Sequence, residues 1–201
     1  MGLNVFQSLR KGVSGQQPLP HVPAFKELYD AGVTPRQGQV VMVAGRSGSQ
    51  KSGFALYWVA SMGLPTLYFS ADMAPFTAGV RLASIATGMS SKEVEAMMGT
   101  TSGRAQIEQA ASSLPIELSF GSPITWEQVE DELNAYVMLH NEYPKVVVFD
   151  NLMDFAGCES DYEAQMGVMQ DVIAFARTTG ATVIVLHHAS DKTLDAKSNP
   201  W

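Results

Sequence analysis

Short apolar runs of strand length recur along the chain from about residue 39 onward, and helical patterns separate them. Each run is too short for a confident helix assignment, and turn residues bound most of them, which is typical of buried strands. The predicted strands are 40–44, 66–70, 116–119, 146–150 and 182–186. Strands that alternate with helices predict an α/β fold, a mostly parallel twisted sheet with helices on both faces.

The helical patterns between these runs carry their own start signals. Pro75 suits the first turn of a helix. Thr125 and Gln128 have the spacing of a capping box, and Ile124 and Val129 that of a hydrophobic staple. The predicted helices are 24–29, 51–62, 75–87, a helix-rich stretch over 90–113, a helix from Thr125 to about 140, and 161–178.

Composition places the chain among ordinary globular domains and excludes several classes. The 201 residues are 46% hydrophobic and 16% charged, which suits one compact domain. We expect a flexible lead-in over 1–23 and a domain over 24–201. No apolar run approaches the roughly 18 residues that cross a bilayer, and the single Cys158 cannot form an internal disulfide. A cytoplasmic protein without membrane contact is therefore expected.

The first predicted strand runs directly into a Gly/Ser loop and a helix, which is the context of a Walker A phosphate loop. The loop and helix start comprise Gly45, Arg46, Ser47, Gly48, Ser49, Gln50, Lys51 and Ser52. Backbone N–H groups would cradle the phosphates of ATP, while Lys51 reaches the β and γ phosphates and Ser52 offers its hydroxyl to Mg²⁺. Gln50 departs from the pattern, which has glycine there. The alternative is a Gly/Ser turn with an incidental lysine.

A carboxylate ends the apolar run 146–150 and supplies the second half of the pattern. In a Walker B strand, Asp150 would hold Mg²⁺ through a water molecule. Taken alone, an apolar run that ends in Asp also simply marks the end of a strand. We expect this strand to lie beside the first one in the sheet.

Several stretches, in their order and spacing, resemble the RecA-like ATPase domain of DnaB-type replicative helicases. They are GQVVMVAGRSGSQKSGFALYWVA, LYFSADM with Arg81 after it, ITWEQVEDELNAY, KVVVFDNLMD and VIVLHH. The resemblance covers about residues 39–188, and plasmid helicases of the RepA type and RadA- and KaiC-like ATPases are similar. It implies a RecA-like P-loop NTPase core.

The resemblance also implies roles for two further residues. Asp72 aligns with a glutamate that orients the attacking water, and it is shorter by one methylene, roughly 1.5 Å of reach. A helix cap before Pro75 is the alternative for Asp72. His188 aligns with the residue that senses the γ-phosphate, whereas His187 should face the other side of the strand by alternation. The catalytic candidates are therefore Lys51, Asp72, Asp150 and His188.

The resemblance implies partners as well: ATP or ADP with Mg²⁺, single-stranded DNA, and further copies of the chain in a ring or filament. The net charge of −7 argues against a surface that grips duplex DNA by bulk charge. Compared with the family, we expect the C-terminal strands, the DNA-facing loops and the arginine finger to be missing. Two functions stay open: a Mg²⁺-dependent ATPase of DNA replication or recombination, and a nucleotide-binding regulator or loader with a degenerate loop and little turnover.

Overall fold

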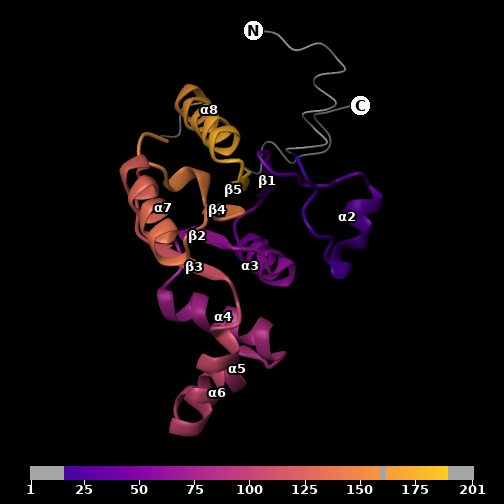
Figure 1. Cartoon of the computed structure of the whole chain (residues 1–201), viewed down its shortest axis with the longest axis vertical. Helices are drawn as coiled ribbons and strands as arrows, with labels where there is room; N and C mark the ends of the chain where they lie inside the picture. Colours follow the sequence, from indigo (N-terminus) through magenta and orange to yellow (C-terminus); the bar gives the residue numbers. More distant parts are fainter. Residues whose placement is uncertain (1–15, 159–161, 190–201) are drawn as a thin grey trace.

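The computed structural model describes residues 16–158 and 162–189. Its centre is a parallel sheet of five strands in the order β1-β5-β4-β2-β3 (Figure 1). The strands are β1 (Val40–Gly45), β2 (Thr66–Ser70), β3 (Ile116–Phe120), β4 (Val146–Asp150) and β5 (Thr182–His188). The helices are η1 (Pro23–Phe25), α2 (Lys26–Asp30), α3 (Lys51–Met62), α4 (Pro75–Thr87), α5 (Ser91–Met98), α6 (Thr101–Ala111), α7 (Trp126–His140), η2 (Leu152–Asp154) and α8 (Tyr162–Thr179).

The predicted strands are all present, but the expected neighbour of the first strand is wrong. β5 lies between β1 and β4, pairing Val40 with Val183 on one side and Val146 with Thr182 on the other. The first five residues of β5 are buried, and four of them are apolar, which suits a central strand of the sheet. The Walker B strand is therefore one strand removed from the phosphate-loop strand.

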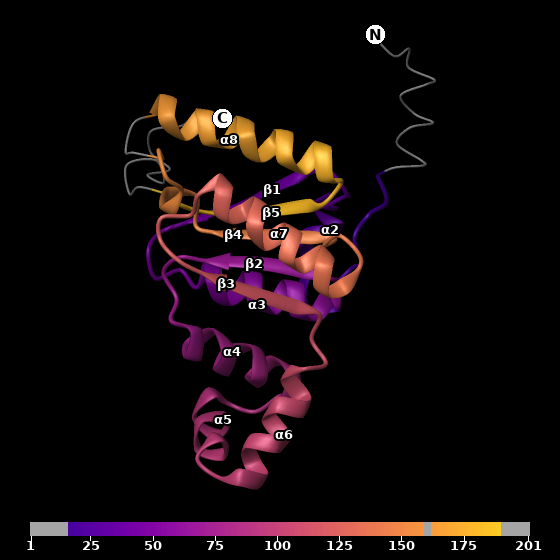
Figure 2. The same ribbon diagram turned by 60° about the vertical axis from the view of Figure 1, so that its left-hand side comes forward.

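Side-chain alternation along the strands divides the core into two layers. Phe69, Phe149 and Val185 pack with α7 and α8 on one face. Tyr68, Val148 and Leu186 pack with α3 on the other face. Figures 1 and 2 show α7 and α3 on opposite sides of the sheet. The three central strands β2, β4 and β5 are buried along almost their whole length and are largely apolar, as strands of parallel sheets usually are, whereas the edge strands β1 and β3 are partly exposed.

Helices α4, α5 and α6 form a separate helical unit beside β3, at the end of the molecule away from α8 (Figure 2). Its own small core contains Val80, Ala83, Val94 and Ile107. Ser90 starts α5 with a complete capping box to Glu93. None of the described helices is both long and apolar enough to cross a bilayer.

Part of the predicted lead-in packs against the core. Leu19 and Val22 are buried among the residues of the α3 layer. The hydroxyl of Tyr29 accepts hydrogen bonds from the backbone N–H of Val22 at 3.0 Å and from Trp58 Nε1 at 3.3 Å. This hydroxyl therefore ties residue 22 to α3. Residues 1–15 of the predicted lead-in lie outside the described part of the chain, as do residues 190–201 of the predicted domain.

The capping box predicted for α7 is half formed. Thr125 Oγ1 accepts from the backbone N–H of Gln128 at 3.1 Å, as expected for an N-cap. The Gln128 side chain does not return this bond and instead donates to Ser119 Oγ at 3.2 Å. The Gln128 side chain thus bonds to Ser119 near the end of β3 instead of to the backbone at the start of α7.

Gln50, the residue that departs from the phosphate-loop pattern, has a left-handed backbone with φ 62° and ψ 27°. Glycine adopts this conformation freely, whereas a residue with a Cβ is strained by about 1 kcal/mol or more. Asn141, which ends α7 at φ 55°, is the other described residue besides glycine with a positive φ. Asparagine tolerates this region better than glutamine does.

We expect Gln50→Gly to raise the free energy of unfolding by about 0.5–1 kcal/mol, because it removes this backbone strain although it also loosens the unfolded chain. Denaturant unfolding measures the change. Asn141→Gly is the matched control, and it should raise the free energy of unfolding by less than Gln50→Gly does. A Gln50→Gly chain that is less stable than the parent would show that the glutamine side chain stabilises the loop.

Candidate functional site

A polar cleft of about 190 Å³ opens at the carboxyl edge of the sheet. It is lined by Gly48, Gln50, Lys51, Ser52, Gly53, Asp72, Arg81, Asp150 and His188. All four predicted catalytic residues are in this set. Of the predicted loop residues in the described chain, Gly45, Arg46, Ser47 and Ser49 do not line the cleft. Residues separated by up to 140 positions therefore meet in one place, where ligands of parallel α/β sheets bind.

One face of the sheet supplies the strand residues of this cleft. Asp150 follows Val148 at a spacing of two, and His188 follows Leu186 in the same way; both apolar residues pack in the α3 layer. Side chains two apart on a strand share a face, so Asp150 and His188 are on the side of α3. This helix begins with Lys51, so the three groups converge at the carboxyl edge of the sheet.

Lys51 is buried, with 8% of its surface exposed, and its ammonium group has three hydrogen-bond partners. Nζ donates to the backbone oxygens of Gly45 at 3.0 Å and Arg46 at 2.9 Å. It also lies 3.1 Å from Nδ1 of His188. An ammonium group can only donate, so Nδ1 of His188 is the acceptor in this contact. The backbone oxygens of Gly45 and Arg46 thus hold the lysine in the cleft.

The two adjacent histidines have different environments, as alternation predicts. His188 contacts Lys51, whereas Nδ1 of His187 is buried without a hydrogen-bond partner among the described residues. Burial lowers the pKa of His187, with smaller contributions from His188 and Lys51, so its ring stays neutral at pH 7.

The carboxylate of Asp150 is almost fully buried, with 4% of the residue exposed. The hydroxyl of Tyr68, on the neighbouring strand β2, donates to its Oδ2 at 2.8 Å. Burial raises the pKa of Tyr68 well above its usual value, and the nearby charge of Asp150 adds to the effect. The phenol therefore stays protonated and remains a donor throughout the physiological range.

Asp72 lies just beyond the end of β2 and is held from the neighbouring strand. Asn151, which follows β4, donates from Nδ2 to Oδ2 of Asp72 at 3.1 Å. Asn151 is itself fixed, because its Oδ1 accepts from the N–H of Met153 at 2.8 Å. The capping alternative for Asp72 is wrong: Ala74 occupies the N-cap of α4, and no side chain caps that helix.

The donors in the cleft suit a small hard cation. Ser52 and Asp150 both line it and offer a hydroxyl and a carboxylate, which are the ligand types that Mg²⁺ prefers. Ser70, whose Cα pairs with that of Asp150, has a buried hydroxyl without a partner in the described chain. A buried hydroxyl of this kind calls for a water or ion nearby. The residues present therefore fit a hydrated Mg²⁺.

Four residues of the site were not among the predicted site residues, although the family resemblance included Arg81; one of the four is Gly53, which lines the cleft. Arg81, on α4, lines the cleft, with Nη1 3.8 Å from the sulfur of Met73. Tyr68 and Asn151 contact the two acidic side chains from neighbouring strands. The pairing of β2 with β4 brings them there, and nothing in the local sequence around either residue signals it.

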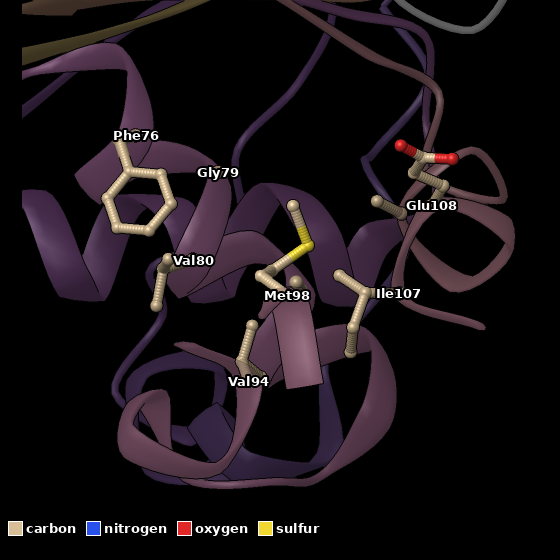
Figure 3. Close-up of a pocket in the computed structure, with 9 residues that line it drawn as sticks. Phe76, Gly79, Val80, Val94, Met98, Ile107 and Glu108 are labelled. Carbon is tan, nitrogen blue, oxygen red and sulfur yellow. The ribbon is translucent and has the colours of Figure 1, made fainter. Parts of the chain in front are cut away.

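A second cavity, also about 190 Å³, lies within the helical unit and is different in chemistry (Figure 3). Phe76, Val80, Val94, Met98 and Ile107 line it, and Figure 3 shows Glu108 on the side away from Phe76. A cavity with this apolar lining offers no cradle for a triphosphate. The polar cleft is therefore the candidate nucleotide site.

Comparison with known proteins gives a family and a fold. The family described as "AAA domain" matches residues 22–193. The Gene 65 protein of Mycobacterium phage L5 is 31% identical over 197 residues, which covers 92% of this chain and 69% of that protein. The Gene 65 protein of Mycobacterium phage D29 is 29% identical over 155 residues, covering 75% and 67%.

Solved structures agree with this family at the level of the fold. A DnaB-like replicative helicase, described with its interactions with primase, superposes with a TM-score of 0.73 at 16% identity. The alignment covers all of this chain and 52% of the helicase, so the chain spans about half of that protein. A second solved ATPase domain gives a TM-score of 0.72 at 16% identity, covering all of this chain and 76% of its own. The chain belongs to the AAA domain family, and its fold is that of a RecA-like P-loop ATPase domain resembling those of DnaB-like helicases.

Proposed function

We propose that the polar cleft binds ATP with Mg²⁺ and hydrolyses the γ-phosphate, as the ATPase of a DNA replication or recombination assembly. The observation that carries the proposal is the convergence of Lys51, Ser52, Asp72, Asp150 and His188 in one cleft. Lys51 and Ser52 come from the start of α3, and Asp72 comes from the turn after β2. Asp150 and His188 are the last residues of β4 and β5. A chance Gly/Ser turn with a lysine would not gather them.

In this proposal the loop and Lys51 position the triphosphate. Lys51 exchanges the backbone oxygens of Gly45 and Arg46 for phosphate oxygens, and the first N–H groups of α3 add their partial positive charge. Bound Mg²⁺ offsets charge on the phosphates, and Ser52 and Asp150 are the residues that would hold it. The barrier to phosphoryl transfer falls mainly through such positioning and charge.

Asp72 and His188 act at the γ-phosphate end of the site. The Asp72 carboxylate accepts a hydrogen bond from the attacking water and takes its proton as the water oxygen bonds to the γ-phosphorus. The bond from that phosphorus to the bridging oxygen breaks, and ADP is the leaving group. Asn151 keeps that carboxylate in one orientation. His188, released from Lys51 when the lysine turns to phosphate, is then free to donate from a ring nitrogen to a phosphate oxygen and report its presence.

The wider setting is also part of the proposal. Single-stranded DNA and further copies of this chain, in a ring or filament, are the partners that the helicase resemblance suggests. A reducing cytoplasm suits a chain whose one cysteine, Cys158, is buried.

A nucleotide-binding regulator or loader with little turnover is the second candidate. The left-handed Gln50 in the loop and the short side chain of Asp72 favour it. Saturable ATP binding without phosphate release above background, even with single-stranded DNA present, would select this candidate over the first.

We expect Lys51→Ala to lower Mg²⁺-dependent phosphate release by at least about 100-fold, because it removes the charge that contacts the phosphates. A colorimetric phosphate assay measures the loss. Lys145→Ala is the matched control, since Lys145 is exposed and precedes β4 at the opposite edge of the sheet. Unchanged phosphate release in Lys51→Ala would contradict the assignment of this cleft as the active site.

We expect Asp72→Asn to reduce turnover about 100-fold or more while ATP affinity is kept, because the amide cannot accept the proton from water. Single-turnover hydrolysis and calorimetric titration measure the two quantities. Asp131→Asn, on the exposed side of α7, removes the same charge away from the cleft and should change neither. If Asp72→Asn turns over like the parent, another group activates the water.

A further inference from the structure

Tyr68 is a buried polar residue that has no role in the proposed binding and hydrolysis of ATP. It is completely buried in the α3 layer of the core. Its hydroxyl reaches Oδ2 of Asp150 at 2.8 Å, across 82 positions of sequence. A phenylalanine would fill the same apolar space, so packing alone does not account for the hydroxyl.

The register of the two strands explains how the hydroxyl arrives there. Tyr68 pairs with Val148, and Ser70 pairs with Asp150. Tyr68 is thus the diagonal neighbour of Asp150 on the same face, at a separation that a long aromatic side chain can bridge. The directly opposite residue, Ser70, is small and leaves room for the tyrosine to lean toward the carboxylate.

We propose that Tyr68 is the positioning residue of the metal-site carboxylate: by holding Oδ2 of Asp150, it leaves Oδ1 as the oxygen presented to hydrated Mg²⁺. This inference rests on the proposed function of the cleft. A hydrogen bond to one oxygen fixes the rotation of the carboxylate, so the group does not have to be ordered when the cation arrives. Residues that orient metal ligands in this way typically contribute 10–100-fold to metal affinity.

The same contact makes Asp150 a less mobile ligand than a solvated carboxylate. Asp150 ends β4, where a free side chain could rotate toward the cleft or away from it. The Tyr68 hydroxyl, anchored by a completely buried ring, removes one of these choices. A ligand that is already oriented suits a cation that keeps most of its water shell and tolerates little distortion.

The test uses Tyr68→Phe, which deletes the hydroxyl and keeps the ring. Calorimetric titration with a non-hydrolysable ATP analogue is carried out over a series of Mg²⁺ concentrations. We expect the Mg²⁺ concentration for half-maximal enhancement of analogue affinity to rise about 10–100-fold, with unchanged affinity in the absence of Mg²⁺. Tyr136→Phe is the matched control, because Tyr136 is also buried but lies on α7 in the opposite layer.

A double-mutant cycle with Asp150→Asn separates positioning from general stability. In the Asp150→Asn background, Tyr68→Phe should cause no further change in Mg²⁺ dependence, since the ligand that it orients is already altered. If Tyr68→Phe does not fold, the ring signals of ¹³C-labelled tyrosine in the parent chain with bound analogue serve instead. Those of Tyr68 should shift on Mg²⁺ addition, and those of Tyr136 should not.

The outcomes are distinguishable. If the parent binds the analogue with a clear Mg²⁺ dependence and Tyr68→Phe matches Tyr136→Phe, the positioning role is overturned and the proposed function stands. An absence of ring shifts at Tyr68 would have the same meaning. If the parent chain does not bind the analogue at all, the proposed function fails, and the role of Tyr68 fails with it.

Discussion

Parallel pairing combined with side-chain alternation is the constraint on which the site depends. All strands of the sheet run in one direction, so their carboxyl ends meet at one edge. Alternation then sends every second side chain to the layer of α3. Asp150 and His188 reach the phosphate-loop helix for this reason, and a slip of one residue in either strand would turn them away from it.

The interior of the cleft shows which hydrogen bonds support the buried charges of the site. Lys51 has two backbone oxygens and an imidazole nitrogen as partners, and Asp150 has a phenol. Each charge therefore has a hydrogen bond that lowers the cost of its burial. β2 and β4 each orient the acidic side chain of the other: Tyr68 on β2 donates to Asp150, and Asn151 after β4 donates to Asp72. Both acidic side chains are thus oriented by neutral donors.

Local patterns predicted the elements of this fold well, because the physical signals are local. Continuous apolar runs marked the buried strands, and Pro75 marked the start of α4 at its observed position. The phosphate-loop pattern placed Lys51 at the first residue of α3. The same pattern has glycine at position 50, and Gln50 adopts the left-handed backbone conformation that glycine adopts freely.

Other features were beyond the sequence because they depend on strand order. Nothing in β5 shows that it lies between β1 and β4, and the expectation of adjacent Walker strands was therefore wrong. The partners of Asp150 and Asp72 could not be found for the same reason, since both bonds cross from one strand to its neighbour. The side-chain amide of Gln128 donates to Ser119 on β3 instead of to the helix start, and this contact cannot be predicted from the residues around Thr125.

The proposed function requires the polar cleft to bind ATP in a Mg²⁺-dependent way. Calorimetric titration of ATP into the unmodified chain, with Mg²⁺ and then with Mg²⁺ removed by chelation, tests it most directly. We expect saturable binding with one ATP per chain that weakens when Mg²⁺ is removed, because Ser52 and Asp150 then lose the cation they share with the phosphates. Absence of binding, or an affinity that does not depend on Mg²⁺, would contradict it.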